Sequence, residues 1–201
     1  MDNTQVENII QNIHQLYEKL QTEMRDKYNR DLPLDELLFD RWEHARRLNF
    51  GKNTSIYHNS FIFGDVKIGE NTWVGPYTVL DGSGGEVTIG SYCSVGSGTH
   101  IYTHDSARWA VSGGKAAYEH GPVKIGSCVF IGPQVIITRG VTIGDHSLIS
   151  ANTFVNRDIQ PYSIVTGSPG RVIGKVLIEG DDVKFVYSGS HASPRKTLPS
   201  S

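Results

Sequence analysis

The sequence predicts an all-β solenoid preceded by a helical segment, and three observations lead to this prediction. First, an aliphatic residue returns at every sixth position between residues 56 and 155, with two interruptions. Second, glycine follows the aliphatic residue at half of these positions, and a small or β-branched residue often stands four places after it. Third, the first 55 residues lack this period and carry apolar residues at helical spacing. The register positions are Ile56, Ile62, Ile68, Val74, Leu80, Ile89, Val95, Ile101, Ile125, Ile131, Ile137, Ile143, Ile149 and Val155.

Residues 1–55 form the predicted helical segment. Thr4 followed by Glu7 has the spacing of a capping box, and apolar residues recur after it with helical periodicity, so we expect a helix from about residue 4 to 27. A second amphipathic helix is expected from about Asp35 to Leu48. These helices could dock a partner or form a wall of an acceptor pocket. We favour a third role, in which they cover the open end of the solenoid and its strand edges.

Residues 56–175 form the predicted solenoid domain. Six residues suit one short strand plus one tight corner, and they are out of phase with a helix of 3.6 residues per turn. Three such units make a triangular coil, and about five stacked coils bury their aliphatic residues in one continuous column. Glycine suits the corners because it adopts positive φ without a steric penalty.

Two interruptions of the register predict loops. The first, from about Asp81 to Val87, adds three residues and is expected to widen a corner. The second separates Ile101 from Ile125 and contains no repeat, so residues 102–124 are expected to project from the solenoid. Long excursions inside a compact fold are usually functional.

Residues 176–201 form the predicted C-terminal part. Two short strands, at 176–178 and 183–187, are expected around a turn from Glu179 to Asp182. Residues 188–201 are rich in serine and proline, which predicts a disordered tail.

Composition excludes some partners and compartments. The net charge is -2 and the pI is about 6.4, so no overall basic field attracts nucleic acid or an anionic membrane. No basic and apolar leader opens the sequence, and no stretch approaches the ~20 apolar residues that cross a bilayer. We therefore expect a cytoplasmic protein. Cys93 and Cys128 both lie inside repeat units and are expected to be small buried residues rather than a disulfide or metal pair.

Three stretches carry a family resemblance: Ile-Gly-Glu-Asn-Thr-Trp-Val-Gly-Pro at 68–76, Ile-Gly-Ser-Cys-Val-Phe-Ile-Gly-Pro at 125–133, and Gly-Val-Thr-Ile-Gly-Asp-His-Ser-Leu-Ile-Ser-Ala-Asn-Thr-Phe-Val at 140–155. They resemble the hexapeptide-repeat acyltransferases. The closing segment, Ile-Val-Thr-Gly-Ser-Pro-Gly-Arg-Val-Ile-Gly-Lys at 164–175, resembles that of the acetyl-CoA-dependent sugar O-acetyltransferases. The resemblance implies a left-handed parallel β-helix, a homotrimer with active sites between subunits, and acetyl-CoA as the donor substrate.

A histidine is the expected catalytic base. Acetyl transfer to a hydroxyl needs a base, and imidazole titrates near neutral pH. In the resembled family the base is a histidine from this part of the coil, which implies His104 in the predicted loop. The family commonly places this histidine two residues further on, where this sequence has Ser106, so His100 remains the alternative. Asp105 is expected to point away from the imidazole, which leaves the orienting group unidentified.

The resemblance also implies a donor site made of backbone and small residues, because the pantetheine arm is a narrow chain with two amides. Two cationic residues would bind the nucleotide phosphates. Plain corner geometry and an ordinary solvated surface are the alternatives for these positions. The implied donor residues are Pro133, Ala151, Asn156, Gly167, Arg171 and Lys175.

The function implied is acetyl transfer from acetyl-CoA to a hydroxyl, less readily an amine, of a sugar or sugar-linked acceptor, as in surface polysaccharide synthesis. One alternative is a noncatalytic scaffold that recruits partners through its helices. Another is a metal enzyme like the γ-class carbonic anhydrases, which share the solenoid and bind zinc with three histidines. Their His-x4-His spacing is missing, and no metal ligand is assigned among His100, His104, His120 and His146.

Overall fold

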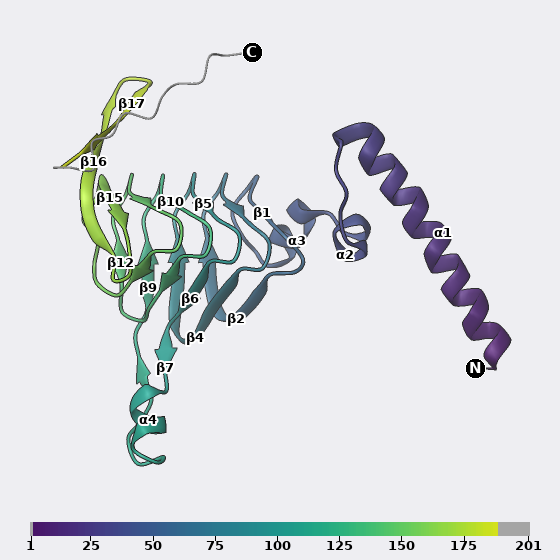
Figure 1. Ribbon diagram of the computed structural model, residues 1–201, viewed down its shortest axis with the longest axis horizontal. Coiled ribbons are helices and arrows are strands. Elements are labelled where there is room, and N and C mark those ends of the chain that lie inside the picture. The colour runs from purple at the N-terminus through teal and green to yellow at the C-terminus, as the bar shows by residue number, and fades with distance from the viewer. Residues whose placement is uncertain (1, 189–201) are drawn as a thin grey trace.

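The computed structural model describes residues 2–188 (Figure 1). Its helices are α1 Asn3–Tyr28, α2 Leu34–Leu38, α3 Arg41–Arg47 and α4 Ala107–Val111. Its strands are β1 Ser55–Ile56, β2 Phe61–Ile68, β3 Trp73–Val74, β4 Val79–Ile89, β5 Ser94–Val95, β6 His100–Tyr102, β7 His104–Asp105, β8 Glu119–His120, β9 Val123–Ile125, β10 Phe130–Ile131, β11 Ile136–Ile137, β12 Thr142–Ile143, β13 Leu148–Ile149, β14 Phe154–Val155, β15 Ser163–Thr166, β16 Arg171–Glu179 and β17 Asp182–Tyr187.

Short parallel strands stack one above the other in a first sheet. Its order is β1, β3, β5, β10, β13 and β15, followed by the antiparallel strands β16 and β17. Where the register is unbroken, paired residues lie 18 positions apart, as Ser55 does from Trp73 and Phe130 from Leu148. Eighteen residues are three six-residue units, so the predicted repeat of short parallel strands is confirmed.

A second sheet follows the order β12, β9, β4, β6, β11 and β14, with β2 paired to β4. The first half of β4 pairs with β6, and its second half pairs with β9. This sheet therefore carries two rows of parallel strands that share β2 and β4. Between the two halves the pairing of β2 with β4 shifts, from Gly64 opposite Gly82 to Val66 opposite Val87. The three residues added near Asp81 to Val87 sit at this shift.

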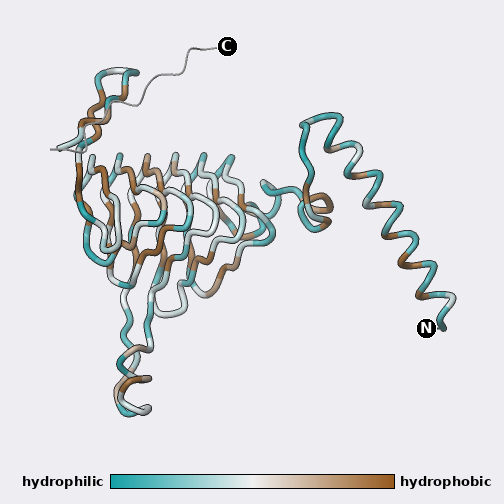
Figure 2. The backbone as a smooth tube through the Cα atoms, in the orientation of Figure 1, coloured by the Kyte–Doolittle hydropathy of each residue, from teal (hydrophilic) through white to brown (hydrophobic). Residues whose placement is uncertain are grey.

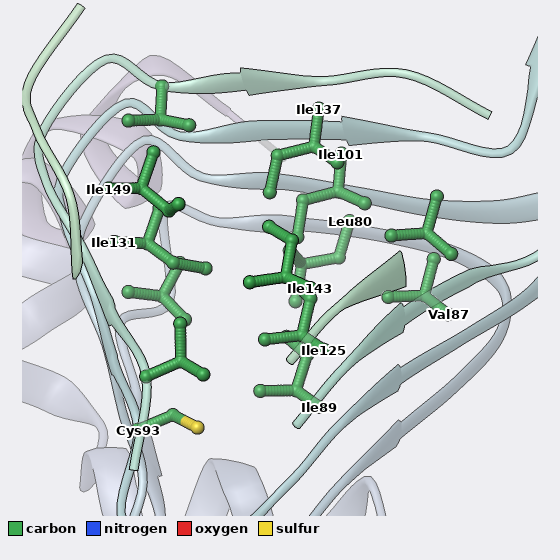
Figure 3. Packing of buried hydrophobic residues seen from close by; sticks show 14 of the residues in the cluster. Leu80, Val87, Ile89, Cys93, Ile101, Ile125, Ile131, Ile137, Ile143 and Ile149 are labelled. Atoms are coloured by element: carbon green, nitrogen blue, oxygen red, sulfur yellow. The ribbon is translucent and has the colours of Figure 1, made fainter. Parts of the chain in front are cut away.

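The aliphatic register forms the core. Apolar residues recur at short intervals along the stacked strands (Figure 2). All fourteen register residues are buried except Ile62, which is half-buried. Ile62 lies on β2, the outermost strand of its row, which pairs only with β4. Residues from neighbouring strands stack into columns, such as Ile131 on Ile149 and Ile101 on Ile137 (Figure 3).

The N-terminal helices differ in detail from the sequence prediction. Helix α1 is confirmed, but its N-cap is Asp2 rather than Thr4, and the capping box joins Asp2 to Gln5. The single helix expected over residues 35–48 is two short helices, α2 and α3. The break lies at Phe39, whose backbone is extended, and Asp40 caps α3 by accepting a hydrogen bond from the Glu43 N–H at 2.8 Å. Aspartate favours such a cap over a helix interior.

Helix α3 packs on the first strand of the stack. Ala45 of α3 is buried, and Phe50, which follows the helix, is buried in the same core cluster. The other large apolar residues of the segment expected to form one amphipathic helix, Leu38, Phe39 and Trp42, are half-exposed.

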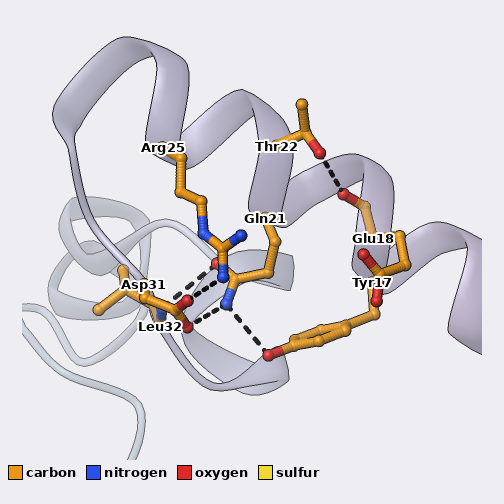
Figure 4. Close-up of polar contacts among 7 residues, drawn as sticks. All are labelled: Tyr17, Glu18, Gln21, Thr22, Arg25, Asp31 and Leu32. Atoms are coloured by element: carbon orange, nitrogen blue, oxygen red, sulfur yellow. Dashed lines mark hydrogen bonds and ion pairs between the residues drawn. The ribbon is translucent and has the colours of Figure 1, made fainter.

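Helix α1 does not cover the end of the stack and extends away from it (Figure 1). Its C-terminal end is held by polar contacts. Gln21 and Arg25 both bind the Asp31 carboxylate, and Gln21 accepts a hydrogen bond from the Leu32 N–H (Figure 4). The described part of the chain contains no helix with the length and apolar character needed to cross a membrane.

The two cysteines differ in exposure, and only one agrees with the sequence prediction. Cys93 is buried, and burial raises the pKa of its thiol. Cys128 is exposed, so the prediction that both cysteines are buried is wrong for this residue. Cys128 takes a φ of 59° at a corner, where the side chain points out of the stack. Strands β16 and β17 form the expected antiparallel C-terminal pair, but β16 begins at Arg171, five residues before the strand expected at 176–178. The predicted disordered tail, residues 188–201, lies outside the described residues except for Ser188.

We predict that Ile143→Ala lowers the free energy of unfolding by about 2–5 kcal/mol, because it empties space in a close-packed column. Ile143 is 1% exposed. The matched control is Thr142→Ala on the outward side of the same two-residue strand, where we expect a change within about 0.5 kcal/mol. Urea denaturation of both variants measures the difference. Equal midpoints for the two variants would contradict the inward register.

Candidate functional site

The projecting loop is held by a short antiparallel ladder at its base. Strand β7 pairs with β8, so that His104 lies opposite His120 and Asp105 opposite Glu119. Helix α4 lies between these strands, at the far end of the projection (Figure 1). The loop predicted over residues 102–124 is therefore an ordered hairpin whose stem carries the predicted catalytic histidine.

Arg139 fixes the stem from the next row of the stack. Its Nε lies 3.0 Å from Oδ2 of Asp105, and its Nη2 lies 2.5 Å from Oε2 of Glu119. The guanidinium thus contacts one carboxylate on each strand of the stem. The pKa of Asp105 is lowered, first because its carboxylate accepts a hydrogen bond from the Ala107 N–H and then because of Arg139. Asp105 therefore serves the loop, and it points away from His104 as expected.

Gly84 lies directly against His104. A Cβ atom on Gly84 would come within 2.5 Å of the His104 Cβ and 2.9 Å of Nδ1 of His120. The Gly84 N–H also donates a hydrogen bond to Oγ1 of Thr103 at 2.9 Å, and that hydroxyl donates to the Asp81 carbonyl at 2.7 Å. A side chain at Gly84 would displace the histidine, so this glycine is required by close approach.

Asp81 faces the imidazole. Oδ2 of Asp81 lies 3.6 Å from Nδ1 of His104, and the Asp81 side chain is 11% exposed. Nδ1 is buried and has no hydrogen-bond partner within the described residues. The other carboxylate oxygen, Oδ1, accepts hydrogen bonds from both the backbone N–H and the hydroxyl of Ser83. A small movement would bring Nδ1–H onto the carboxylate, which would leave Nε2 free to accept a proton.

Sequence reasoning missed Asp81, Gly84 and Arg139. Asp81 and Gly84 lie in the three-residue insertion, which the sequence predicts only as a widened corner. The position of Asp81 in the repeat could have identified it, because Asp81 pairs with Tyr102, which directly precedes the loop. An insertion one row before a long loop, on the same corner, places its residues beside the base of that loop.

His100, the alternative base, lies on the outward face of β6. Its Nδ1 is 3.2 Å from the Tyr102 hydroxyl, and the two rings meet edge to face at 5.9 Å between centroids. No described carboxylate forms an ion pair with it. The rings of His104 and His120 lie 6.2 Å apart between centroids, tilted by 31°.

The six predicted donor residues are all exposed. Pro133 and Ala151 occupy corners of neighbouring rows, because the Asn152 N–H donates to the Pro133 carbonyl at 3.0 Å. Gly167 occupies the next row, where its carbonyl accepts from the Phe154 N–H at 3.0 Å. Arg171 and Lys175 lie on β16 and form no ion pair with any described residue.

The structure does not bring these six residues to His104. Among the described residues, no hydrogen bond or ion pair joins the two sets. Within residues 2–188, no group of three or more His, Cys, Asp or Glu side chains is arranged to hold a metal ion.

Comparisons with known proteins agree with this architecture. The family model described as bacterial transferase hexapeptide (six repeats) matches residues 122–157. Chloramphenicol acetyltransferase of Morganella morganii is 33% identical over 108 residues, which are 45% of this chain and 51% of that protein. Galactoside O-acetyltransferase of Escherichia coli K12 is 30% identical over 137 residues, which are 67% of this chain and 57% of that protein. The chain thus spans little more than half the length of these two relatives.

A hexapeptide-repeat acetyltransferase of Vibrio cholerae has been solved in two forms. The complex with acetyl coenzyme A is 28% identical, with a TM-score of 0.59, and the match covers 83% of this chain and 88% of that one. The other structure is 30% identical, also with a TM-score of 0.59, and the match covers 83% of this chain and 92% of that one. Together with the six-residue register and its parallel stacked strands, these matches show that the chain belongs to the hexapeptide-repeat acyltransferase family.

Proposed function

We propose that the protein is an acetyltransferase that moves an acetyl group from acetyl-CoA to a hydroxyl of a sugar or sugar-linked acceptor. The observation that carries the proposal is the pair formed by His104 and the buried Asp81 at the base of the projecting loop. Relatives that match the chain are a galactoside O-acetyltransferase and an acetyltransferase solved with acetyl coenzyme A. Another relative is a chloramphenicol acetyltransferase, so relatives of this chain differ in their acceptors.

The proposed mechanism is direct transfer with His104 as the general base. Asp81 holds the tautomer in which Nδ1 carries the proton, so Nε2 takes the proton of the acceptor hydroxyl. The hydroxyl oxygen attacks the acetyl carbonyl carbon of the thioester, and the tetrahedral intermediate collapses and expels the coenzyme A thiolate. His104 then returns the proton to the thiolate. Direct transfer needs proximity and a base, and no acyl-enzyme forms.

In this proposal the donor binds along the exposed corners. Small residues at Pro133, Ala151 and Gly167 leave the backbone accessible to the narrow pantetheine arm. Asn156 is the fourth residue of this proposed binding surface for the pantetheine arm. Arg171 and Lys175, which have no ion-pair partner among the described residues, bind the nucleotide phosphates.

We also propose that the stacked rows close into a left-handed parallel β-helix and that three copies assemble side by side. The outward rows of the stack differ in character. One row is polar and consists of Lys67, Thr88, Lys124, Thr142 and Asp158. A second row is largely apolar and consists of Phe61, Val79, His100, Ile136 and Phe154.

This apolar row supports lateral association. Phe61 is 59% exposed and Ile136 is 41% exposed in the single chain. Phe61 also stacks on Phe63 with 6.2 Å between ring centroids. An apolar row of this kind marks an interaction surface. The projecting loop departs directly after the β6 strand of this row, so a neighbouring copy could bring its donor corners to His104.

We predict opposite kinetic effects for His104→Ala and Arg171→Ala. Loss of the general base should lower kcat on the order of 10²- to 10⁴-fold and leave the KM for acetyl-CoA nearly unchanged. Loss of the Arg171 cation should raise that KM with less effect on kcat. Steady-state kinetics with sugar acceptors measures both. Full activity in His104→Ala together with loss in His100→Ala would move the base to His100, and full activity in both variants would refute the mechanism.

A thermal-shift experiment with coenzyme A separates this enzyme from a noncatalytic scaffold. Coenzyme A should raise the melting temperature of both His104→Ala and the parent protein by mass action. A scaffold would show no shift.

We predict that Asp81→Asn lowers kcat by at most the loss expected without the imidazole, on the order of 10²- to 10⁴-fold, because Asp81 acts through His104 by holding its tautomer. The KM for acetyl-CoA should stay constant. Ser83→Ala is the matched control, since it removes only one hydrogen bond to the carboxylate and should have a smaller effect. Unchanged kcat in Asp81→Asn, with native far-ultraviolet circular dichroism, would remove Asp81 from the site.

We predict that light scattering gives the mass of a trimer, which is three times the 22.2 kDa mass of one chain. Ile136→Asp should lower this mass, because a buried charge opposes the apolar contact. Thr142→Asp on the polar row should leave the measured mass unchanged. A mass near that of one chain at micromolar concentration would contradict the trimer.

A further inference from the structure

One half of helix α1 presents an exposed apolar face. The α1 stripe consists of Val6, Ile9, Ile10, Ile13 and Leu16, and each of these side chains is between 42% and 49% exposed. Figure 2 shows apolar residues recurring along this helix, which stands clear of the stacked strands. The face continues toward the C-terminal half of α1, where Tyr17, Leu20 and Met24 are partly buried.

The stability of α1 depends on covering this stripe. The C-terminal half is anchored by Gln21, whose side chain bonds to Asp31 and the Leu32 N–H. The N-terminal half has a capping box, but among the described residues no side-chain hydrogen bond or ion pair joins residues 3–16 to the rest of the fold. Most helical stability in proteins comes from packing an apolar face rather than from propensity. The bare half therefore requires a partner surface to remain a helix in water.

The spacing and charge of the stripe point to a second copy of the same helix. Val6, Ile9, Ile13, Leu16 and Leu20 alternate at intervals of three and four residues, which is the seam of a coiled coil. Between residues 3 and 17, Glu7 is the only charged side chain at neutral pH. Two such stripes can therefore meet without like-charge repulsion.

The same charges argue against a membrane as the occupant. Helices that lie on anionic membranes carry Lys and Arg on their polar face. Residues 2–18 contain Asp2, Glu7 and Glu18 and no Lys or Arg. An anionic surface would repel this part of the helix.

We propose that the α1 stripe packs against the α1 stripe of a second copy of the chain. Five side chains are fewer than the ~20–30 residues a side of a stable interface, so another contact must hold the copies together. In this respect the inference rests on the proposed lateral association, which would place α1 helices at the same end of one assembly. The effective concentration of one helix near another is then in the millimolar range.

Disulfide trapping tests the contact directly. Ile13→Cys is made in the full chain with Cys128→Ser, because Cys128 is exposed and Cys93 is buried. Mild oxidation should link two chains on a non-reducing gel. The matched control is Gln11→Cys on the opposite side of α1, which should give little linked product in the time that links Ile13→Cys, because its thiol faces away from the second helix. Equal rates for the two positions would overturn the proposal.

A second measurement covers the case in which the cysteine variant folds poorly. Ile9→Asp with Ile13→Asp should reduce the helical circular dichroism signal, whereas Gln11→Asp with Gln15→Asp should not. Identical spectra for the two double variants would overturn the proposal. Light scattering of the stripe variant distinguishes this failure from failure of the trimer, because lateral association through the stack should survive loss of the α1 contact.

Discussion

Contact between aliphatic side chains of successive rows is the interaction on which every other part of this molecule depends. A two-residue strand buries one side chain and exposes the other, so it has no stability apart from the rows on either side. Ile131, for example, stacks between Val95 and Ile149 in the same sheet. This requirement fixes the inward positions and leaves the outward positions and corners free to vary.

That division explains where the candidate site lies. Extra residues at a corner do not disturb the column, since the chain returns to the same inward position after each insertion. The three-residue insertion near Asp81 and the hairpin that carries His104 leave from the same corner on neighbouring rows. Each insertion alone is a surface loop. Stacking brings them together, so that the carboxylate of one faces the imidazole of the other at 3.6 Å.

The sequence predicted the periodic parts of the molecule well and the insertions poorly. The inward register could be read because each aliphatic position obeys the same local rule. Asp81 could not be assigned as the partner of His104, because their contact depends on how the ladder shifts between Gly64 and Val66. The position of Cys128 within a repeat predicts burial, but its corner has positive φ and the side chain is exposed. Helices α2 and α3 are separate because Asp40 caps the start of α3, whereas the apolar spacing continues across the break and predicts one helix.

The last strands of the stack also determine how the molecule can grow. A parallel stack with a free upper edge could accept the first row of another molecule and lengthen into a fibre. Here the Phe154 N–H and carbonyl are occupied by Gly167 and Gly170, and the chain then turns antiparallel into β16. Thr142 is likewise covered by the segment at Asp158 and Ile159. With these hydrogen-bonding groups occupied, the last parallel strands of the described chain offer no free edge at this end, so another stack cannot extend the molecule there.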